Sequence, residues 1–76
     1  MKYIKYNLIG FVIFPEMLLH SDVHKSLSTH DELVSAGFVE MNGGEFVCSG
    51  KSESLKIGSL REDSFECTSQ LGHGYE

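Results

Sequence analysis

The 76-residue sequence has few basic residues and only one proline. Six lysines and arginines stand against eleven acids, which gives a formal net charge of −5, and the basic residues are scattered along the chain. Proteins that bind duplex nucleic acid neutralise phosphates with clustered lysine and arginine, so the composition argues against a nucleic-acid partner. The single proline and the apolar share of 41% are typical of a globular chain rather than a disordered one.

Cysteines and long hydrophobic runs are also scarce. The chain has two cysteines, Cys48 and Cys67, and a disulfide-stabilised secreted domain of this size usually carries more. We therefore expect two reduced, mostly buried thiols and a cytoplasmic protein. The most apolar run, residues 8–14, ends at Pro15 and is too short to span a bilayer. No small-residue cleavage site follows it, as a signal peptide would require, and we expect no contact with membranes.

The chain has no internal repeats or linkers, which predicts one domain over residues 1–72 and a flexible tail over residues 73–76. Residues 2–6 are rich in strand-forming types, residues 7–10 supply turn chemistry, and residues 11–14 are β-branched or aromatic throughout. This pattern predicts a first hairpin, closed at Pro15 because proline cannot donate to a strand ladder.

A second hairpin is predicted over residues 33–49. Leu33 to Met41 indicates a strand, Asn42-Gly43-Gly44 a tight turn, and Glu45 to Ser49 the returning strand. Gly37, inside the first of these strands, indicates a bulge or a close approach of another backbone segment.

The sequence predicts a C-terminal helix, and either a loop or a short helix between the two hairpins. Ser21 or Asp22 can cap a short helix that runs through Leu27. Ser59 and Glu62 have capping-box spacing, which predicts a C-terminal helix that ends near Gly72. The expected apolar stripe of this helix consists of Leu60, Phe65, Cys67, Thr68 and Leu71.

These elements predict an α+β fold, namely a small antiparallel β-sheet of two hairpins with a C-terminal helix on one face. The order is strand, strand, loop or short helix, strand, strand, helix. In the second strand, Phe11 and Ile13 point one way and Val12 and Phe14 the other, which is typical of a central strand covered on both faces. One small helix cannot cover both faces, so we predict that Phe11, Val12, Ile13 and Phe14 form a surface for self-association or for a protein partner.

His20 and His24 are four residues apart, a spacing that lets two zinc ligands share one face of a helix, and His30 and Asp22 are near enough to complete a site. If Ser21 or Asp22 is the cap, however, His20 lies outside the helix and the shared face is lost. We therefore predict no metal and keep a small metal-binding module as an alternative.

Catalytic and cofactor motifs are not supported by their spacing. Residues 44–52 resemble a phosphate-binding loop, but five residues separate Gly44 from Gly50 where the loop needs four, and the intervening residues indicate a strand. Neither cysteine lies beside basic residues that would lower its pKa, and no nucleophile motif frames a serine. We predict neither a cofactor nor an enzymatic activity.

Three stretches, residues 14–16, 35–39 and 48–55, followed by the acidic pair Glu62-Asp63, resemble short proteins encoded in tailed-phage and prophage genomes. This family has no assigned activity. The resemblance implies a bacterial, intracellular setting and a phage-related role, and it carries no catalytic residue over to this chain.

The leading hypothesis is a non-enzymatic phage or prophage accessory protein that acts through protein–protein contacts, with a homodimer as one form of them. Two alternatives stay open, the metal-binding module of His20 and His24, and an inhibitor of a host defence enzyme.

Overall fold

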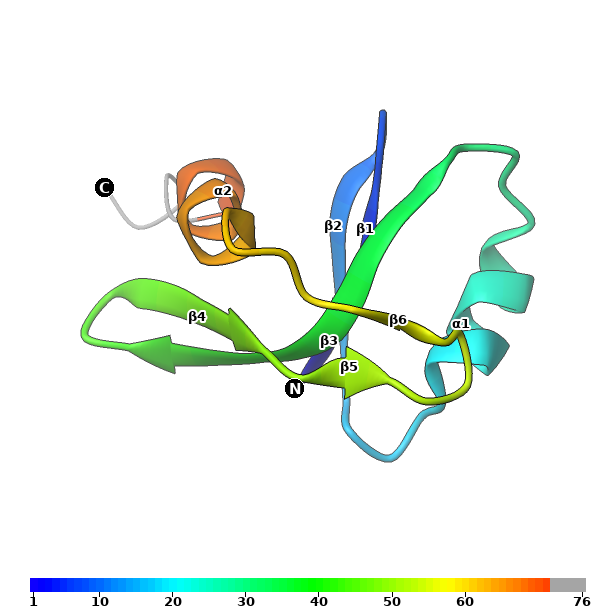
Figure 1. The fold of residues 1–76 in the computed structure, drawn as a ribbon, viewed down its shortest axis with the longest axis horizontal. Coiled ribbons are helices and arrows are strands. Elements are labelled where there is room, and N and C mark those ends of the chain that lie inside the picture. Colours follow the sequence, from blue (N-terminus) through cyan, green and yellow to red (C-terminus); the bar gives the residue numbers. More distant parts are fainter. Residues whose placement is uncertain (72–76) are drawn as a thin grey trace.

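A computed structural model describes residues 1–71 and confirms the α+β class (Figure 1). A four-stranded antiparallel sheet has the strand order β2-β1-β3-β4, and a separate two-stranded sheet consists of β5 and β6. The predicted helix end at Gly72 and the predicted tail lie outside the described residues. The elements are β1 (Lys2–Tyr6), β2 (Gly10–Phe14), α1 (His20–Leu27), β3 (Leu33–Asn42), β4 (Glu45–Ser49), β5 (Lys51–Ser52), β6 (Ile57–Gly58) and α2 (Asp63–Leu71).

The first hairpin forms as predicted. β1 and β2 pair in antiparallel fashion from Lys2 opposite Phe14 to Tyr6 opposite Gly10. Gly10 takes a left-handed φ of +89°, which a glycine adopts without the steric cost of a Cβ and which closes the short loop. The carboxylate of Asp31 accepts hydrogen bonds from backbone N–H groups of this loop and ties it to the segment before β3.

The second hairpin also forms, with its turn placed on two glycines. Gly43 and Gly44 have φ values of +61° and +88°, while Asn42 is still paired with Glu45 in the ladder. The close approach predicted for Gly37 is confirmed. A Cβ at this position would lie 2.6 Å from the backbone oxygen of Ser49, so no larger residue fits without a backbone shift.

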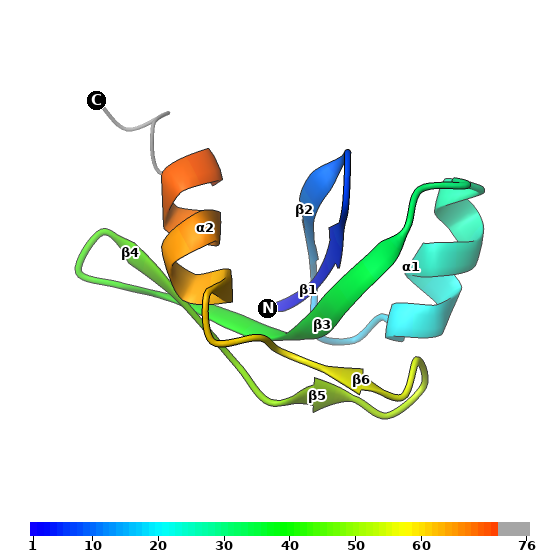
Figure 2. The ribbon, with the colours of Figure 1, turned by 45° about the horizontal axis from the view of Figure 1, so that its top comes forward.

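β2 is an edge strand and not the central strand that its composition indicated. Its two faces are both covered, because one core lies under α2 and a second core lies under α1 and the β5–β6 hairpin. Figure 2 shows the β1–β2 hairpin between the two helices. The expectation that one face stays uncovered is therefore wrong, since α1 and the β5–β6 hairpin supply the second layer.

The burial of β2 corrects the predicted interaction surface. Phe11 is only 7% exposed in the first core and Phe14 only 6% exposed in the second. Val12 and Ile13 are half-buried and pack against these cores. Phe11 and Phe14 are therefore core residues, and only the backbone edge of the strand is left without a neighbouring strand.

Neither predicted helix cap forms. α1 begins at His20 with Leu19 at the N-cap position, where no side chain of the helix accepts a hydrogen bond. The N–H of Ser21 instead donates to Ser54 Oγ at 3.1 Å, so the cap comes from the loop between β5 and β6. The prediction of Ser21 or Asp22 as the cap is wrong because a distant hydroxyl group takes that role.

α2 begins at Asp63, later than its predicted cap. Ser59 Oγ donates to the carbonyl oxygen of Gly50 at 3.0 Å, and the Asp63 carboxylate accepts from the N–H of Leu60 at 2.9 Å. The capping box predicted for Ser59 and Glu62 is therefore absent. One of the two hydrogen bonds of such a box, from a backbone N–H to the acidic side chain three residues later, forms one residue further along, between Leu60 and Asp63. Within residues 1–71, neither helix is long and apolar enough to cross a membrane.

Candidate functional site

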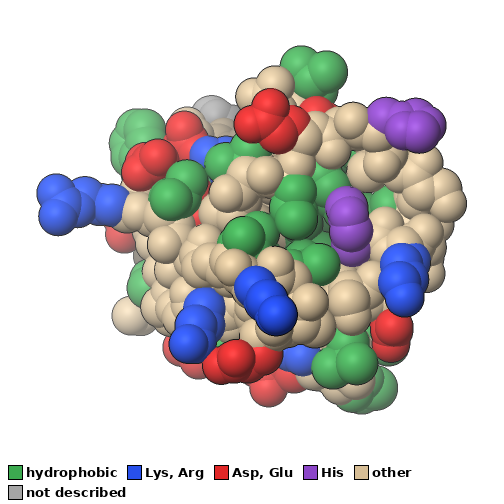
Figure 3. Space-filling view, turned by 45° about the vertical axis from the view of Figure 1, so that its right-hand side comes forward, with side chains coloured by type: hydrophobic (Ala, Val, Ile, Leu, Met, Phe, Trp, Pro, Cys, Tyr) green, Lys and Arg blue, Asp and Glu red, His purple; other side chains and the backbone are tan. Residues whose placement is uncertain are grey.

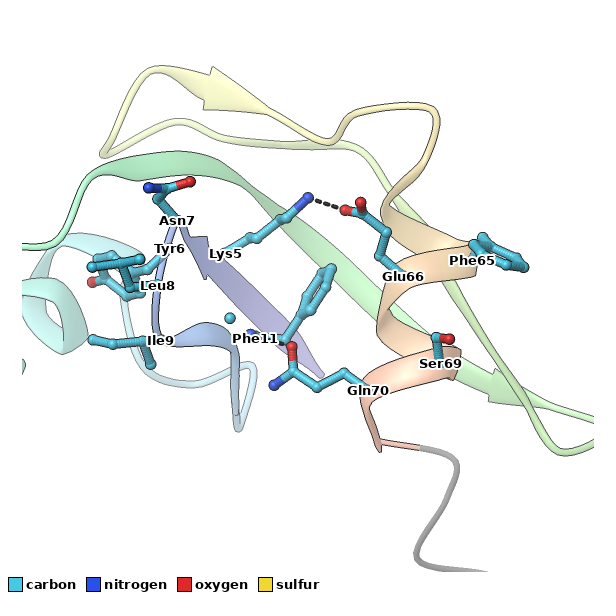
Figure 4. Close-up of a pocket in the computed structure, with 11 residues that line it drawn as sticks. Lys5, Tyr6, Asn7, Leu8, Ile9, Phe11, Phe65, Glu66, Ser69 and Gln70 are labelled. Atoms are coloured by element: carbon cyan, nitrogen blue, oxygen red, sulfur yellow. Dashed lines mark hydrogen bonds and ion pairs between the residues drawn. The ribbon is translucent and has the colours of Figure 1, made fainter.

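A groove of about 550 Å³ separates the tip of the first hairpin from α2 (Figure 4). We call it the hairpin groove. Residues 5–11 form one wall, and Phe65, Glu66, Ser69 and Gln70 form the other. Leu8 and Phe65, at its rim, are 85% and 77% exposed, and Ile9 is also exposed. Large apolar side chains are therefore exposed on both sides of the groove, Leu8 and Ile9 from the turn between β1 and β2 and Phe65 from the far side of α2 (Figure 4).

Polar contacts join the two walls. Lys5 Nζ forms an ion pair with Glu66 and lies 3.6 Å from Asp63 Oδ1. Burial by itself lowers the pKa of Lys5. The hydrogen bond and charge of Glu66, together with the charge of Asp63, raise this pKa by more than burial lowers it, so the net shift is upward. The Phe11 N–H donates to Gln70 Oε1 at 3.3 Å. The charges on the floor of the groove are thus paired with each other.

A fully buried contact lies behind the ion pair. Tyr3 OH donates to Asp63 Oδ2 at 2.5 Å, and both residues are completely shielded from solvent. Burial raises the pKa of Tyr3 well above its usual range, and the hydrogen bond and charge of Asp63 raise it further. The contact therefore anchors the start of α2 to β1 across 60 residues of sequence.

Both cysteines are free thiols, and Cys67 is fully buried as predicted, while Cys48 is half-buried. Burial, followed by the influence of Cys48, raises the pKa of Cys67 to about 12. Burial also raises the pKa of Cys48, with a further contribution from the charge of Asp63. A nucleophilic cysteine needs a lowered pKa, so these thiols have the electrostatics of core residues.

The histidines are placed differently from the prediction. Because α1 begins at His20, His20 and His24 do share a helix, yet each ring contacts the protein. His20 Nε2 lies 2.9 Å from the carbonyl oxygen of Gly37 and therefore donates to it. His24 Nδ1 lies 2.6 Å from Tyr6 OH. His30 is exposed in the loop before β3, and residues 1–71 contain no group of three or more potential ligands placed to hold a metal ion.

The segment that resembles a phosphate-binding loop consists of two strands. β4 and β5 flank Gly50, whose φ is +76°, and no helix follows the lysine and serine of the segment. The prediction that the residues between Gly44 and Gly50 form a strand is confirmed.

Phe65 is the site residue that the sequence interpretation misplaced. The buried side of α2 carries Asp63, Cys67 and the half-buried Leu71, spaced four residues apart. Phe65 lies off this stripe. Had Asp63 been counted as a buried position, helical periodicity would have placed Phe65 on the exposed side.

The face over α1 and the β5–β6 hairpin looks different. In Figure 3, hydrophobic side chains gather in the middle of this face beside a histidine, and basic and acidic side chains surround them. Lys51 and Glu53 form an exposed ion pair of 3.7 Å on the β5–β6 hairpin, and an exposed pair of this kind contributes little to stability. This face offers no concentration of one charge.

Comparison of the chain with protein-family models, with curated proteins and with solved structures gives no match. The resemblance to short phage-encoded proteins accordingly stays a prediction.

Proposed function

We propose that this chain is a non-enzymatic interaction module that binds another protein at the hairpin groove. The observation that carries the proposal is the exposure of Leu8, Ile9 and Phe65 around one groove. Apolar side chains that gather on a surface are typical of protein-binding sites, whereas scattered ones need no explanation. The hairpin and the helix that hold them are joined by Lys5 and Glu66, so the surface is formed before a partner arrives.

The chemistry around the groove supports binding rather than catalysis. General acid–base catalysis needs a group whose pKa lies near the working pH. The shifts at Tyr3, Lys5 and Cys67 all move the pKa upward, away from neutrality. The resemblance to short phage-encoded proteins supports a phage or prophage accessory role in a bacterial cell. An inhibitor of a host enzyme would use the same kind of surface, and the identity of the bound protein separates the two roles.

Charge substitutions in the groove test this proposal. Leu8→Lys combined with Phe65→Lys places two charges among the exposed apolar side chains, and Leu27→Lys is the matched control. Leu27 is also an exposed leucine but lies at the end of α1, on the other side of the sheet (Figure 2). Each protein is immobilised and exposed to bacterial lysate, and the bound proteins are quantified by mass spectrometry.

We expect the native chain and the Leu27→Lys variant to bind the same lysate proteins, and we expect the double variant to lose them. With the purified partner, the double variant should weaken binding at least about tenfold, since one buried leucine or phenylalanine contributes about 1.5–3 kcal/mol. If the double variant keeps its native thermal transition and still retains the same proteins, the groove is not the binding site.

A further inference from the structure

The two edges of the four-stranded sheet are treated differently. At the β4 edge, the N–H groups of Phe46 and Cys48 each donate to a hydroxyl group of α2 at 2.8 Å. Those hydroxyl groups belong to Thr68 and Ser64, and each also donates back to the carbonyl group of the same strand residue. Ser64 and Thr68 are one helical turn apart, which places their hydroxyl groups opposite Cys48 and Phe46, two residues apart on the strand. The helix thus satisfies the backbone groups of this edge and covers it.

Within residues 1–71, the β2 edge has no comparable cover. Val39 N–H donates to Met1 O and Asn7 N–H donates to Glu32 O, so the odd-numbered residues of β1 direct their backbone groups toward β3. The even-numbered residues direct theirs toward β2, where they face Val12 and its even-numbered neighbours. Phe11 and Ile13 therefore point their N–H and C=O groups outward, and the side chain of Gln70 reaches only the N–H of Phe11.

The open edge also lacks charge. Natural edge strands are usually guarded by charged side chains, bulges or a covering element. Residues 8–14 contain no charged residue, and Glu16, just beyond them, is paired with the N-terminal ammonium group at 3.1 Å. Exposed apolar side chains flank both ends of the strand, namely Leu8 and Ile9 before it and Met17 and Leu18 after it.

We propose that a second copy of this chain pairs with the open edge, β2 against β2 in antiparallel orientation, with Val12 on the two-fold axis. This inference rests on the proposed function and deepens it by naming a copy of the chain as a partner. A strand that extends the sheet here must be apolar on both faces, because each face of β2 borders a core, and β2 itself has that property.

The register follows from the backbone. With Val12 on the axis, Phe11 of one copy lies opposite Ile13 of the other, and these are the residues whose backbone groups point outward. Both pairs then exchange N–H and C=O hydrogen bonds once Gln70 releases Phe11. The same register brings the tip residues Leu8 and Ile9 of one copy beside Pro15 and Glu16 of the other. The contact places no unpaired charge against its copy, despite the net charge of −5.

Two cysteine variants test both the dimer and its register. On the axis, the two Val12 residues form a non-hydrogen-bonded pair with Cα atoms about 4.5 Å apart, within the range of a disulfide. Ile13 is diagonal to its own copy at about 7–8 Å, which is beyond disulfide reach. After mild oxidation with diamide, Val12→Cys should form a covalent dimer and Ile13→Cys should not. Peptide mapping identifies the linked residue and separates it from Cys48.

Light scattering of the native chain over a range of concentrations should give the mass of a dimer. Exchange of the Ile13 amide hydrogen in the native chain should slow on the order of tenfold as concentration rises, which requires no variant to fold. A monomer at every concentration, unchanged Ile13 exchange, or equal cross-linking of the two variants would overturn the proposal. If the native chain is a monomer but binds lysate proteins that the Leu8→Lys, Phe65→Lys double variant loses, the dimer is refuted and the proposed function stands. If the native chain is a monomer and binds no such proteins, both the dimer and the proposed function are refuted.

Discussion

Replacing Tyr3 by phenylalanine removes one hydroxyl group from a fully buried contact between the sheet and α2. Tyr3 OH is one of two hydrogen-bond donors to Asp63 Oδ2, the other being the N–H of Leu60. Within the described residues Asp63 Oδ1 accepts no hydrogen bond, and Lys5 Nζ is 3.6 Å away from it. The variant therefore leaves a buried carboxylate with one donor and a distant cation.

The expected loss follows from these contacts. A hydrogen bond to a charged group contributes about 1.5–3 kcal/mol net, and Asp63 is fully buried, so its carboxylate is not exposed to bulk solvent. We expect Tyr3→Phe to lower the free energy of unfolding by about 2–3 kcal/mol. A domain of this length has a total stability of roughly 4–11 kcal/mol, so the melting temperature should fall by about 10–20 °C.

Tyr6→Phe is the matched control. Tyr6 is equally buried, but its hydroxyl group contacts the ring nitrogen of His24 and no carboxylate, so its loss should cost only about 1 kcal/mol. Urea unfolding followed by circular dichroism measures both variants, and a double-mutant cycle with Asp63→Asn isolates the coupling. If Tyr3→Phe costs no more than Tyr6→Phe, or if the cycle shows no coupling, Tyr3 and Asp63 do not anchor α2 as argued.

Three further predictions concern stability. The pKa of Cys67 is raised from 9.0 to about 12 in the folded chain, so as the pH rises the thiol loses its proton in the unfolded chain before it does so in the folded chain. The free energy of unfolding should therefore fall above about pH 9, by up to about 1.4 kcal/mol per pH unit. Urea midpoints at pH 7, 9 and 10 measure this slope, and Cys67→Ala should reduce it, whereas an equal slope in both proteins would contradict the assignment. Gly37→Ala should lower the free energy of unfolding by about 1–3 kcal/mol in the same assay, because the added Cβ meets the backbone oxygen of Ser49. Gly58→Ala is its control and should cost less, since the atom nearest to a Cβ at Gly58 is 3.4 Å away. Lys56→Gly should raise the melting temperature because Lys56 has a left-handed φ of +59°, which costs a non-glycine residue about 1 kcal/mol, and a lower melting temperature would contradict this reasoning.

Features that depend on neighbouring residues could be predicted from the sequence. The two long hairpins form at the predicted places because Gly10, Gly43 and Gly44 allow turns that other residues resist. Gly37 indicated a close backbone approach for the same local reason. The free, largely buried thiols also followed from composition, since cysteine without a partner behaves as a small apolar residue.

The candidate site could be predicted only in part. The apolar run of residues 8–14 drew attention to the first hairpin, but it did not reveal which of its groups stay exposed. Phe11 is buried under α2, whereas Phe14 is buried because α1 and the β5–β6 hairpin add a second layer. The two-residue strands of that hairpin carry too little sequence pattern to be predicted. The exposed residues of the site, Leu8 and Phe65, emerged only from the packing.

Alternation and turn chemistry by themselves determined the hairpins, because a turn needs only its own few residues to choose its backbone angles. Tertiary structure decided where the helices begin, since the cap of α1 comes from Ser54 and the start of α2 is held by Tyr3. It also decided that β2 lies at an edge, because strand order depends on the pairing of β1 with β3 across more than twenty residues of intervening chain. Such choices depend on which distant groups can satisfy a buried donor or cover an apolar face, and no local pattern encodes them.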